Sequence, residues 1–242
     1  ARIVGMYEDV DDEIRGEQRL SQLDATFLGF GTDPMANIRR LVHDAGSALG
    51  ACAALYNRLE GDRLVVRAAW RAADLLNQSS PADGHICDDL IKEDSRWTKV
   101  IRHLKHSVYA ETDPAVRAMN LETYAGHVVR VQGEALGTIC VLFRVDRDLT
   151  DAELRYLGLI AAAAGVEEMR GRSESKVREA ELRYRTLVEQ LPAISYIVDL
   201  SPNPRTVYIS PQVNTILGFG QNEWCRDPGL WIRQIHEEDR DR

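Results

Sequence analysis

The sequence has few cysteines, and they form no recognisable pattern. The four of them, Cys52, Cys87, Cys140 and Cys225, are widely spaced, and no C-x-x-C pair occurs. A disulfide framework or a zinc ribbon would need closely and regularly spaced cysteines, so neither is indicated. Reduced thiols in an intracellular protein are the simpler interpretation.

Long hydrophobic runs and basic clusters are missing as well. No apolar run approaches the roughly 18 residues of a membrane-spanning helix, and the first residues form no signal-peptide pattern. The formal net charge is -8 and the basic residues are scattered, which argues against a nucleic-acid partner. We therefore expect a cytoplasmic protein that neither spans a membrane nor binds nucleic acid.

Catalytic motifs are the third absence. The sequence contains no Gly-rich ATP-binding loop and no kinase, cyclase or phosphodiesterase motif. We therefore expect no enzymatic activity from these 242 residues and expect any catalytic output to lie outside them.

A long charged helix is the most informative feature that is present. Thr150 and Glu153 fit a capping box at its start, and Pro192 marks its end because proline lacks the N–H and clashes with the preceding turn. About 40 residues at 1.5 Å per residue give a helix of roughly 60 Å, far longer than an ordinary globular helix.

Apolar residues along this helix recur at spacings of three and four, with a polar centre at Arg170 and Ser173. The pattern favours a parallel homodimer whose helices carry motion between domains. The alternative is two shorter helices, broken near Gly165 or Gly171, each packed on its own domain. The row of residues expected to face the second helix, called the seam below, comprises Tyr156, Leu159, Ala163, Val166, Arg170, Ser173, Val177, Ala180, Tyr184, Leu187 and Leu191.

The rest of the chain reads as mixed strand and helix. Residues 1–10 alternate loosely like a strand, and a charged helix follows in 11–26. Pro34 opens another helix that ends at Gly50. Two hairpins are predicted, 52–59 with 63–70 and 123–131 with 135–145, separated by an irregular region. Two short strands, 195–199 and 206–210, follow the long helix. The fold class is α/β in the α+β sense.

Several segments resemble a GAF domain over about Phe27 to Met169. The residues that carry the resemblance are GHICDDLI at 84–91, YAETDPAV at 109–116, and LETYAGHVV followed by GEALGTICVLF, which ends at Phe143. The resemblance implies an antiparallel sheet flanked by helices over 27–149, followed by a signalling helix or coiled coil over 150–191.

Residues 192–242 resemble the first half of a PAS domain. The matching segments are YRTLVEQLPAISYIVDL, YISPQVNTILGFG and WIRQIHEEDRDR. Residues 1–10 resemble the last strand of a preceding PAS domain, and 11–26 its exit helix. The order implies part of a multidomain sensor of the histidine kinase type, in a two-component system.

Cys87 is the sharpest chemical candidate, next to His85 in the irregular region. The resemblance implies that some GAF domains hold haem or a bilin, sometimes through a cysteine. A thiol can form a thioether or ligate iron, and an imidazole can be an axial ligand. Because Asp88 follows Cys87 where many bilin-binding domains have histidine, haem attached at Cys87 is favoured over a bilin. The alternative is that Cys87 is an ordinary buried thiol.

Three other residues complete the candidate cofactor site. His127 alternates with Ala125 and Val129 along a strand, so it faces either the pocket or solvent. Tyr109 and Tyr124 can line a cavity with apolar walls, or be ordinary core aromatics. No metal site is expected.

Three functions remain open. The first is a sensory module that binds a small ligand or haem and relays the change through a dimeric helix to a PAS domain and a distal kinase. The second is a ligand-free dimerisation and interaction module. The third resembles the stand-alone GAF domains that reduce free methionine sulfoxide, for which two cysteines must reach one another.

Overall fold

The computed structural model describes residues 2–202 and 204–239. The chain divides into two compact units, residues 1–173 and 174–242. Each unit has its own sheet, and each is described by itself.

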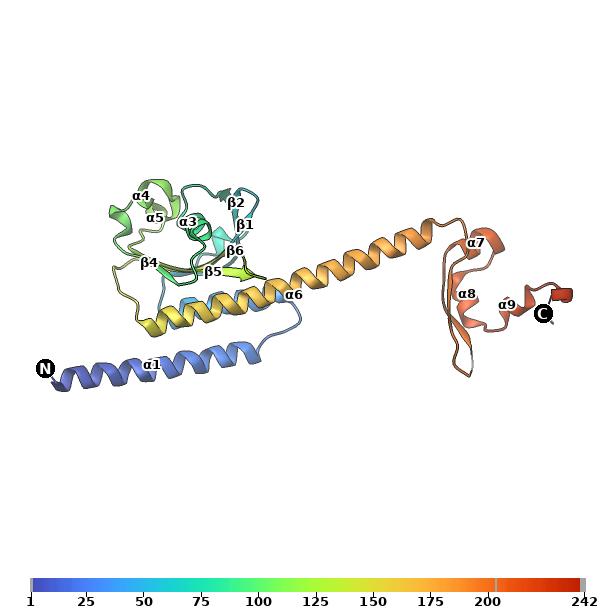
Figure 1. The fold of residues 1–242 in the computed structure, drawn as a ribbon, viewed down its shortest axis with the longest axis horizontal. Helices are drawn as coiled ribbons and strands as arrows, with labels where there is room; N and C mark the ends of the chain where they lie inside the picture. The colour runs from blue at the N-terminus through green and yellow to red at the C-terminus, as the bar shows by residue number, and fades with distance from the viewer. Residues whose placement is uncertain (1, 203, 240–242) are drawn as a thin grey trace. The chain divides into compact units, whose positions relative to one another are not determined.

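The first unit is built on a six-stranded antiparallel sheet with the order β3-β2-β1-β6-β5-β4 (Figure 1). Its strands are β1 (Ala53–Glu60), β2 (Arg63–Trp70), β3 (Ser79–Pro81), β4 (Lys99–Ile101), β5 (Thr123–Val131) and β6 (Glu134–Phe143). The two predicted hairpins, β1–β2 and β5–β6, are therefore confirmed, each with a glycine at positive φ in its turn.

Helices cover both faces of this sheet (Figure 1). One face carries α2 (Pro34–Ala48) and the first half of α6 (Asp151–Gln190), with α1 (Arg2–Leu28) against α2. The other face carries α3 (Ile86–Glu93), α4 (Tyr109–Thr112) and α5 (Pro114–Ala118), together with the 3-10 turns η1 (Ala73–Leu75) and η2 (Leu104–His106). Two hydrophobic clusters result, one on each side of the sheet.

Strand alternation assigns each residue to one cluster. In β1, Tyr56 belongs to the α2 and α6 side, whereas Leu55 belongs to the α3 side. Successive side chains of a strand point to opposite faces, so neighbouring residues of one strand pack into different hydrophobic clusters. Because helices cover both sides, the strands are apolar on both faces instead of alternating apolar with polar.

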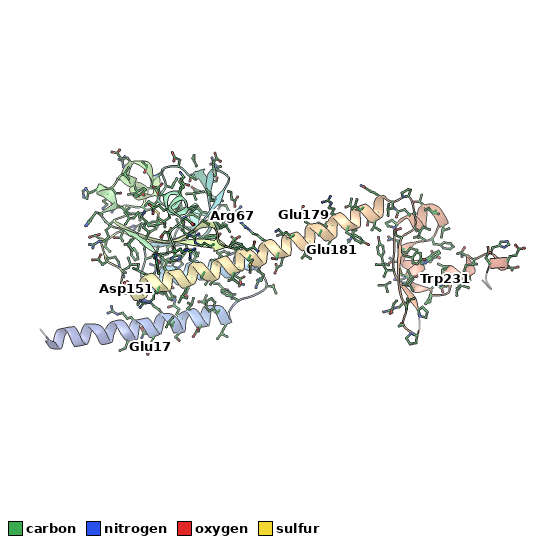
Figure 2. All side chains as sticks on the ribbon, viewed as in Figure 1. Glu17, Arg67, Asp151, Glu179, Glu181 and Trp231 are labelled. Atoms are coloured by element: carbon green, nitrogen blue, oxygen red, sulfur yellow. The ribbon has the colours of Figure 1, made fainter. Side chains whose placement is uncertain are left out.

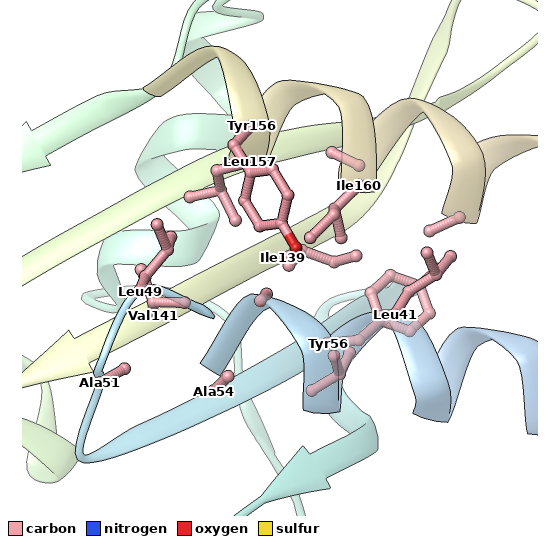
Figure 3. Packing of buried hydrophobic residues seen from close by; sticks show 14 of the residues in the cluster. Leu41, Leu49, Ala51, Ala54, Tyr56, Ile139, Val141, Tyr156, Leu157 and Ile160 are labelled. Atoms are coloured by element: carbon pink, nitrogen blue, oxygen red, sulfur yellow. The ribbon is translucent and has the colours of Figure 1, made fainter. Parts of the chain in front are cut away.

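The first half of α6 packs closely on the sheet. Tyr156, Leu157 and Ile160 point toward Ile139 and Val141 of β6 (Figure 3), and all five are at most 3% exposed. This packing explains why the helix is stable here despite its high charge, since tertiary contacts outweigh local propensity.

The predicted start of the long helix is confirmed. The Thr150 backbone N–H donates to Glu153 Oε2 at 3.0 Å, and the Glu153 N–H donates to Thr150 Oγ1 at 3.3 Å. These reciprocal bonds form a capping box. Glu153 is also paired with Arg147 at 2.8 Å and with Arg19 of α1 at 2.9 Å, which ties α1 to the beginning of α6.

The expected strand at residues 1–10 is wrong, because residues 2–10 lie in helix α1, which continues to Leu28. The apolar alternation in this segment is loose, and the strong helix formers that follow it favour one continuous helix. A strand would also need a neighbouring strand to pair its backbone groups.

Tyr156, Ala163 and Arg170 of the predicted seam make contacts within the first unit instead. Tyr156 is buried in the core, and its hydroxyl donates to Asp44 Oδ2 at 2.8 Å. Arg170 donates to the carbonyl oxygens of Gly31 and Thr32 at 3.0 and 2.7 Å. The side chains of Tyr156 and Arg170 are therefore not free to contact a second copy of the helix. Leu159, Val166 and Val177 are 49%, 59% and 68% exposed.

The second unit contains the end of α6 and a two-stranded antiparallel sheet of β7 (Tyr196–Asp199) and β8 (Arg205–Ile209). Three short helices follow, α7 (Gln212–Leu217), α8 (Gln221–Arg226) and α9 (Leu230–Arg233), then the turn η3 (Glu237–Asp239). Its buried apolar residues are Ile209, Val213, Trp224 and Leu230. On α6, Glu179 and Glu181 are exposed, as is Trp231 of α9 (Figure 2).

Candidate functional site

A cavity of about 340 Å³ lies on the α3 and α5 side of the sheet. Its walls are mainly apolar, and its size is near the lower end of the roughly 300–1,000 Å³ typical of ligand pockets. Gln78 and Ser79 at its edge are exposed, so it opens next to β3. The apolar lining residues are Leu55, Leu64, Val66, Leu75, Val116, Met119, Leu121 and Leu142.

Polar and sulfur-containing side chains meet at the buried end of the cavity. Asn57 Nδ2 lies 3.3 Å from Cys87 Sγ and 3.7 Å from Cys140 Sγ. The Tyr124 hydroxyl lies 3.4 Å from Cys87 Sγ. Asn57 comes from β1, Cys87 from α3, Tyr124 from β5 and Cys140 from β6, so four elements contribute one side chain each.

The two thiols differ in acidity. The neighbouring Cys140 lowers the pKa of Cys87 against the effect of burial. Cys87, together with burial, raises the pKa of Cys140 well above its usual range. A thiol donating to a neighbouring thiolate stabilises that thiolate and holds its own proton more tightly. Cys87 is therefore the more nucleophilic member of the pair.

Tyr124 reaches the thiols because β5 has a glycine two residues later. A Cβ at Gly126 would lie 2.2 Å from the Tyr124 hydroxyl oxygen, which is closer than any real contact. The bare backbone at Gly126 therefore gives the phenol its space. Burial, followed by the neighbouring thiols, raises the pKa of Tyr124 well above its usual value, so it remains a neutral phenol.

His85 and Asp113 form a second polar feature of the cavity. His85 Nδ1 lies 3.3 Å from Asp113 Oδ1. The other carboxylate oxygen accepts from the Ile86 backbone N–H at 3.2 Å, and Asp113 also caps α5 by accepting from Ala115 N at 3.1 Å. The hydrogen bond that the imidazole donates to the Asp113 carboxylate raises the pKa of His85, so the cavity carries an imidazole that protonates readily.

His127 lies on the opposite side of the sheet from Cys87. It points toward α6, where a Cβ at Gly158 would approach its ring to 3.3 Å. Its Nδ1 is 2.9 Å from Thr98 Oγ1, which donates to the Leu154 carbonyl at 2.9 Å. Since the hydroxyl has one hydrogen, Nδ1 of His127 is the donor in this pair. The structure therefore separates His127 from the other candidates.

Tyr109 lies near the cavity without lining it. Its hydroxyl donates to Asp89 Oδ2 at 2.8 Å, which joins α4 to α3. Partial burial and then the Asp89 carboxylate raise the pKa of Tyr109 to about 12. Of the five residues singled out from the sequence, the structure thus brings His85, Cys87 and Tyr124 to one cavity.

A protein-family model for the GAF domain matches residues 33–167, more than half of the chain. The chain belongs to the GAF domain family. The match extends into α6, so the first half of the long helix is part of the GAF domain itself.

Solved structures share this fold at low sequence identity. The GAF domain of a phosphoenolpyruvate-protein phosphotransferase from Coxiella burnetii has a TM-score of 0.59 at 12% identity, covering 66% of this chain and 98% of its own. The phycoerythrobilin-bound GAF domain of a cyanobacterial phytochrome has a TM-score of 0.50 at 14% identity, with coverages of 67% and 97%. A free methionine-R-sulfoxide reductase from Neisseria meningitidis, in complex with its substrate, has a TM-score of 0.51 at 15% identity, with coverages of 60% and 83%.

No curated protein matches the chain. Among residues 2–202 and 204–239, no group of three or more His, Cys, Asp or Glu side chains is placed to hold a metal ion. Nor is any helix among the described residues sufficiently long and apolar to cross a membrane.

Two members of the polar cluster in the cavity, Asn57 and Cys140, were not among the predicted cofactor-binding residues. The signal for Asn57 was a polar side chain between the apolar residues Leu55 and Leu59 on one face of a strand. For Cys140, the even spacing from Leu142 placed both residues on one face of β6. Neither signal indicated that the two side chains meet across 83 residues of sequence.

Proposed function

We propose that this GAF domain binds a small ligand in the cavity and relays the binding through α6. The observation that carries the proposal is the double role of β1. Asn57 faces the cavity, and its neighbour Tyr56 faces the other way and donates to Glu168 Oε1 of α6 at 2.9 Å. A shift of β1 at the ligand would therefore act directly on a buried contact of the helix.

The ligand class follows from the lining of the cavity. Its walls would bury an apolar body, and the readily protonated His85 at one end would attract an acidic or hydrogen-bond-accepting group. Asn57 and Tyr124 offer further hydrogen bonds deeper in the cavity. We therefore propose a small organic molecule with an apolar part and one acidic or carbonyl group.

These features favour a small ligand over haem or a bilin. A tetrapyrrole has four rings, and a cavity of about 340 Å³ is small even for ordinary ligands. Haem held between Cys87 and His127 would need both ligands on one side of the sheet, and Cys87 already contacts Asn57 and Tyr124. Some solved GAF domains bind bilins, but the residues of this chain do not fit that size of cofactor without rearrangement.

The proposed relay extends beyond the GAF domain. The exposed apolar residues of α6 support a homodimer through this helix, and residues 192–242 would act as the PAS-like link to a distal kinase. We propose no catalytic role for the chain itself. The exposed residues that belong to the predicted seam are Leu159, Val166, Val177, Tyr184 and Leu187 on α6, and Leu191 directly after it.

The ligand proposal is tested by filling the cavity. Val66 lines it, whereas its neighbour Val65 points to the other face of β2. We expect ligand-observed NMR with a library of small aromatic and aliphatic carboxylic acids to detect binders of the parent protein and of Val65→Phe, and to detect none with Val66→Phe. Binding that survives in Val66→Phe would contradict the proposed site.

A ligand-free dimerisation platform is the second candidate. The exposed apolar side chains of α6 favour it independently of the cavity. It predicts that no compound in the library binds and that Val66→Phe leaves the oligomeric state unchanged. Native mass spectrometry of the purified protein distinguishes the two candidates, because only the first predicts a retained or added small molecule.

A further inference from the structure

The structure contains a pair of thiols that ligand binding does not use. Cys87 of α3 and Cys140 of β6 are 7% and 1% exposed, and both lie beside the same Asn57 amide nitrogen. Most buried cysteines behave as small apolar residues. These two instead lie 3.3 and 3.7 Å from that one nitrogen, so both sulfur atoms lie at the same end of the cavity.

We propose that Cys87 and Cys140 form a reversible redox site, in which a peroxide that enters the cavity converts the two thiols into an intramolecular disulfide. The pair lies in the same cavity as the small-molecule site proposed above, but disulfide formation needs no bound ligand, so it can be tested whether or not a ligand binds.

The chemistry proceeds in two balanced steps. The Cys87 thiolate attacks one oxygen of hydrogen peroxide, which breaks the O–O bond, gives Cys87 sulfenic acid and releases hydroxide. The Cys140 sulfur then attacks the Cys87 sulfur, its proton passes to the departing hydroxide, and water leaves as the S–S bond forms. Overall, two thiols lose two protons and two electrons, and one hydrogen peroxide takes them up to become two molecules of water.

The surroundings of Cys87 suit it to the first step. The Asn57 amide donates to its sulfur at 3.3 Å, and the Tyr124 hydroxyl lies 3.4 Å away. Both groups stabilise negative charge on sulfur, and the pKa of Cys87 is lowered, first by Cys140. This direction favours the thiolate, which is the form that attacks peroxide.

Cys140 suits the second step by its position. Its sulfur lies 3.7 Å from the same Asn57 amide nitrogen that is 3.3 Å from the Cys87 sulfur, so it lies near the sulfur that becomes electrophilic. Cys87 raises the pKa of Cys140, and this effect weakens once Cys87 is a neutral sulfenic acid.

Access to the pair is provided by the cavity. Cys87 and Cys140 both line it, and its edge at Gln78 and Ser79 is exposed. A peroxide is far smaller than the cavity of about 340 Å³. Larger oxidants such as protein disulfides would be excluded by the buried position of both sulfur atoms.

Peroxide treatment followed by mass spectrometry tests the proposal. The Cys52→Ser, Cys225→Ser variant keeps only the proposed pair. We expect hydrogen peroxide to lower its intact mass by two hydrogen atoms, to remove both titratable thiols, and to yield one cross-linked peptide joining α3 to β6. Dithiothreitol should restore the mass and both thiols.

Matched single-thiol variants on the same background separate the two steps. Cys140→Ser should accumulate a sulfenic acid that dimedone traps at Cys87, and Cys87→Ser should react at least about tenfold more slowly because the less acidic thiol remains. Circular dichroism checks that each variant is folded. Peptide mapping of the peroxide-treated, unsubstituted chain identifies which two cysteines are cross-linked without relying on any variant.

Three results would overturn the proposal. In the first, both thiols stay free at peroxide doses that oxidise the partly exposed Cys52. In the second, Cys87 passes to sulfinic acid without a cross-link. In the third, the cross-link in the unsubstituted chain joins Cys52 or Cys225 instead of the proposed pair.

Discussion

At single residues, the neighbours of a side chain decide its chemistry more than its type does. His85 and His127 show this within one domain. The hydrogen bond that His85 donates to the Asp113 carboxylate raises the pKa of His85, whereas burial, followed by the charge of Arg130, lowers that of His127. The sequence shows two histidines in apolar surroundings and gives no indication of this difference.

We expect the two imidazoles to titrate on opposite sides of the usual value of about 6.5. Because the folded-state pKa of His85 is raised, its contribution to stability is fully present below about pH 6.5 and is lost as the pH rises through the folded value. Histidine NMR titration should show His85 above His127. The unfolding free energy lost in His85→Gln should be larger at pH 5.5 than at pH 8.5.

Asp113→Asn supplies the control for this titration, because it keeps the shape of the side chain and removes its charge. The His85 titration should move down toward the usual value, and that of His127 should not change. A His85 midpoint that is unaffected by Asp113→Asn would show that the pair at 3.3 Å does not set its acidity.

The Tyr56–Glu168 hydrogen bond gives a second prediction for single residues. Glu168 is 5% exposed, and its other partner is Arg58 at 3.4 Å. Tyr56→Phe leaves a buried carboxylate with one partner fewer, so we expect a loss of about 1–3 kcal/mol in unfolding free energy by urea denaturation. The matched Tyr184→Phe change removes a hydroxyl from a side chain that is 68% exposed and should cost less than about 0.5 kcal/mol.

Among the elements, α6 shows that one helix can have different requirements along its length. At Gly165, an added Cβ would lie 2.2 Å from the Arg130 carbonyl oxygen of β5, whereas at Gly171 the nearest atoms belong to Pro34 at 3.6 Å. The first glycine lets the helix approach the sheet, and the second has room for a methyl group. The alternative of two shorter helices broken at either glycine does not hold, since α6 continues through both.

These distances predict opposite effects of the same substitution. Gly165→Ala should destabilise the GAF domain by about 1–3 kcal/mol, because helix and sheet must separate to admit the methyl group. Gly171→Ala should stabilise it by up to about 1 kcal/mol through better helix propensity. Urea denaturation measures both, and a stabilising effect of Gly165→Ala would show that α6 does not pack on β5 this closely.

The success of the sequence predictions also follows the elements. The two long hairpins and the capping box were predictable because each depends on residues adjacent in sequence, such as Thr150 with Glu153. The cavity was not, since Asn57 meets Cys87 across 30 residues and Cys140 across 83. The side of His127 could not be chosen either, because both faces of β5 are buried and alternation alone does not say which face holds the cavity.

For the whole molecule, the contrast between the two units is the main feature. The first unit has a six-stranded sheet with a hydrophobic cluster on each face. The second has two strands, and its buried apolar cluster consists of Ile209, Val213, Trp224 and Leu230. Most side chains of β7 are exposed, including Tyr196 at 67% and Ile197 at 57%. An isolated two-stranded sheet is marginal in water.

Stability should therefore differ between the units of the same chain. Local opening free energies range from near zero up to the global value, and they follow the density of buried contacts. We expect amides of β7 and β8 to exchange at least about 100-fold faster than those of β5 and β6, a difference of roughly 3 kcal/mol. Hydrogen exchange of the full chain, followed by mass spectrometry of peptides from 196–209 and 123–143, measures both in one sample. Equal protection of the two segments at low protein concentration would contradict the expectation. Protection of 196–209 that appears only as concentration rises would instead show that a second copy covers the exposed face of β7.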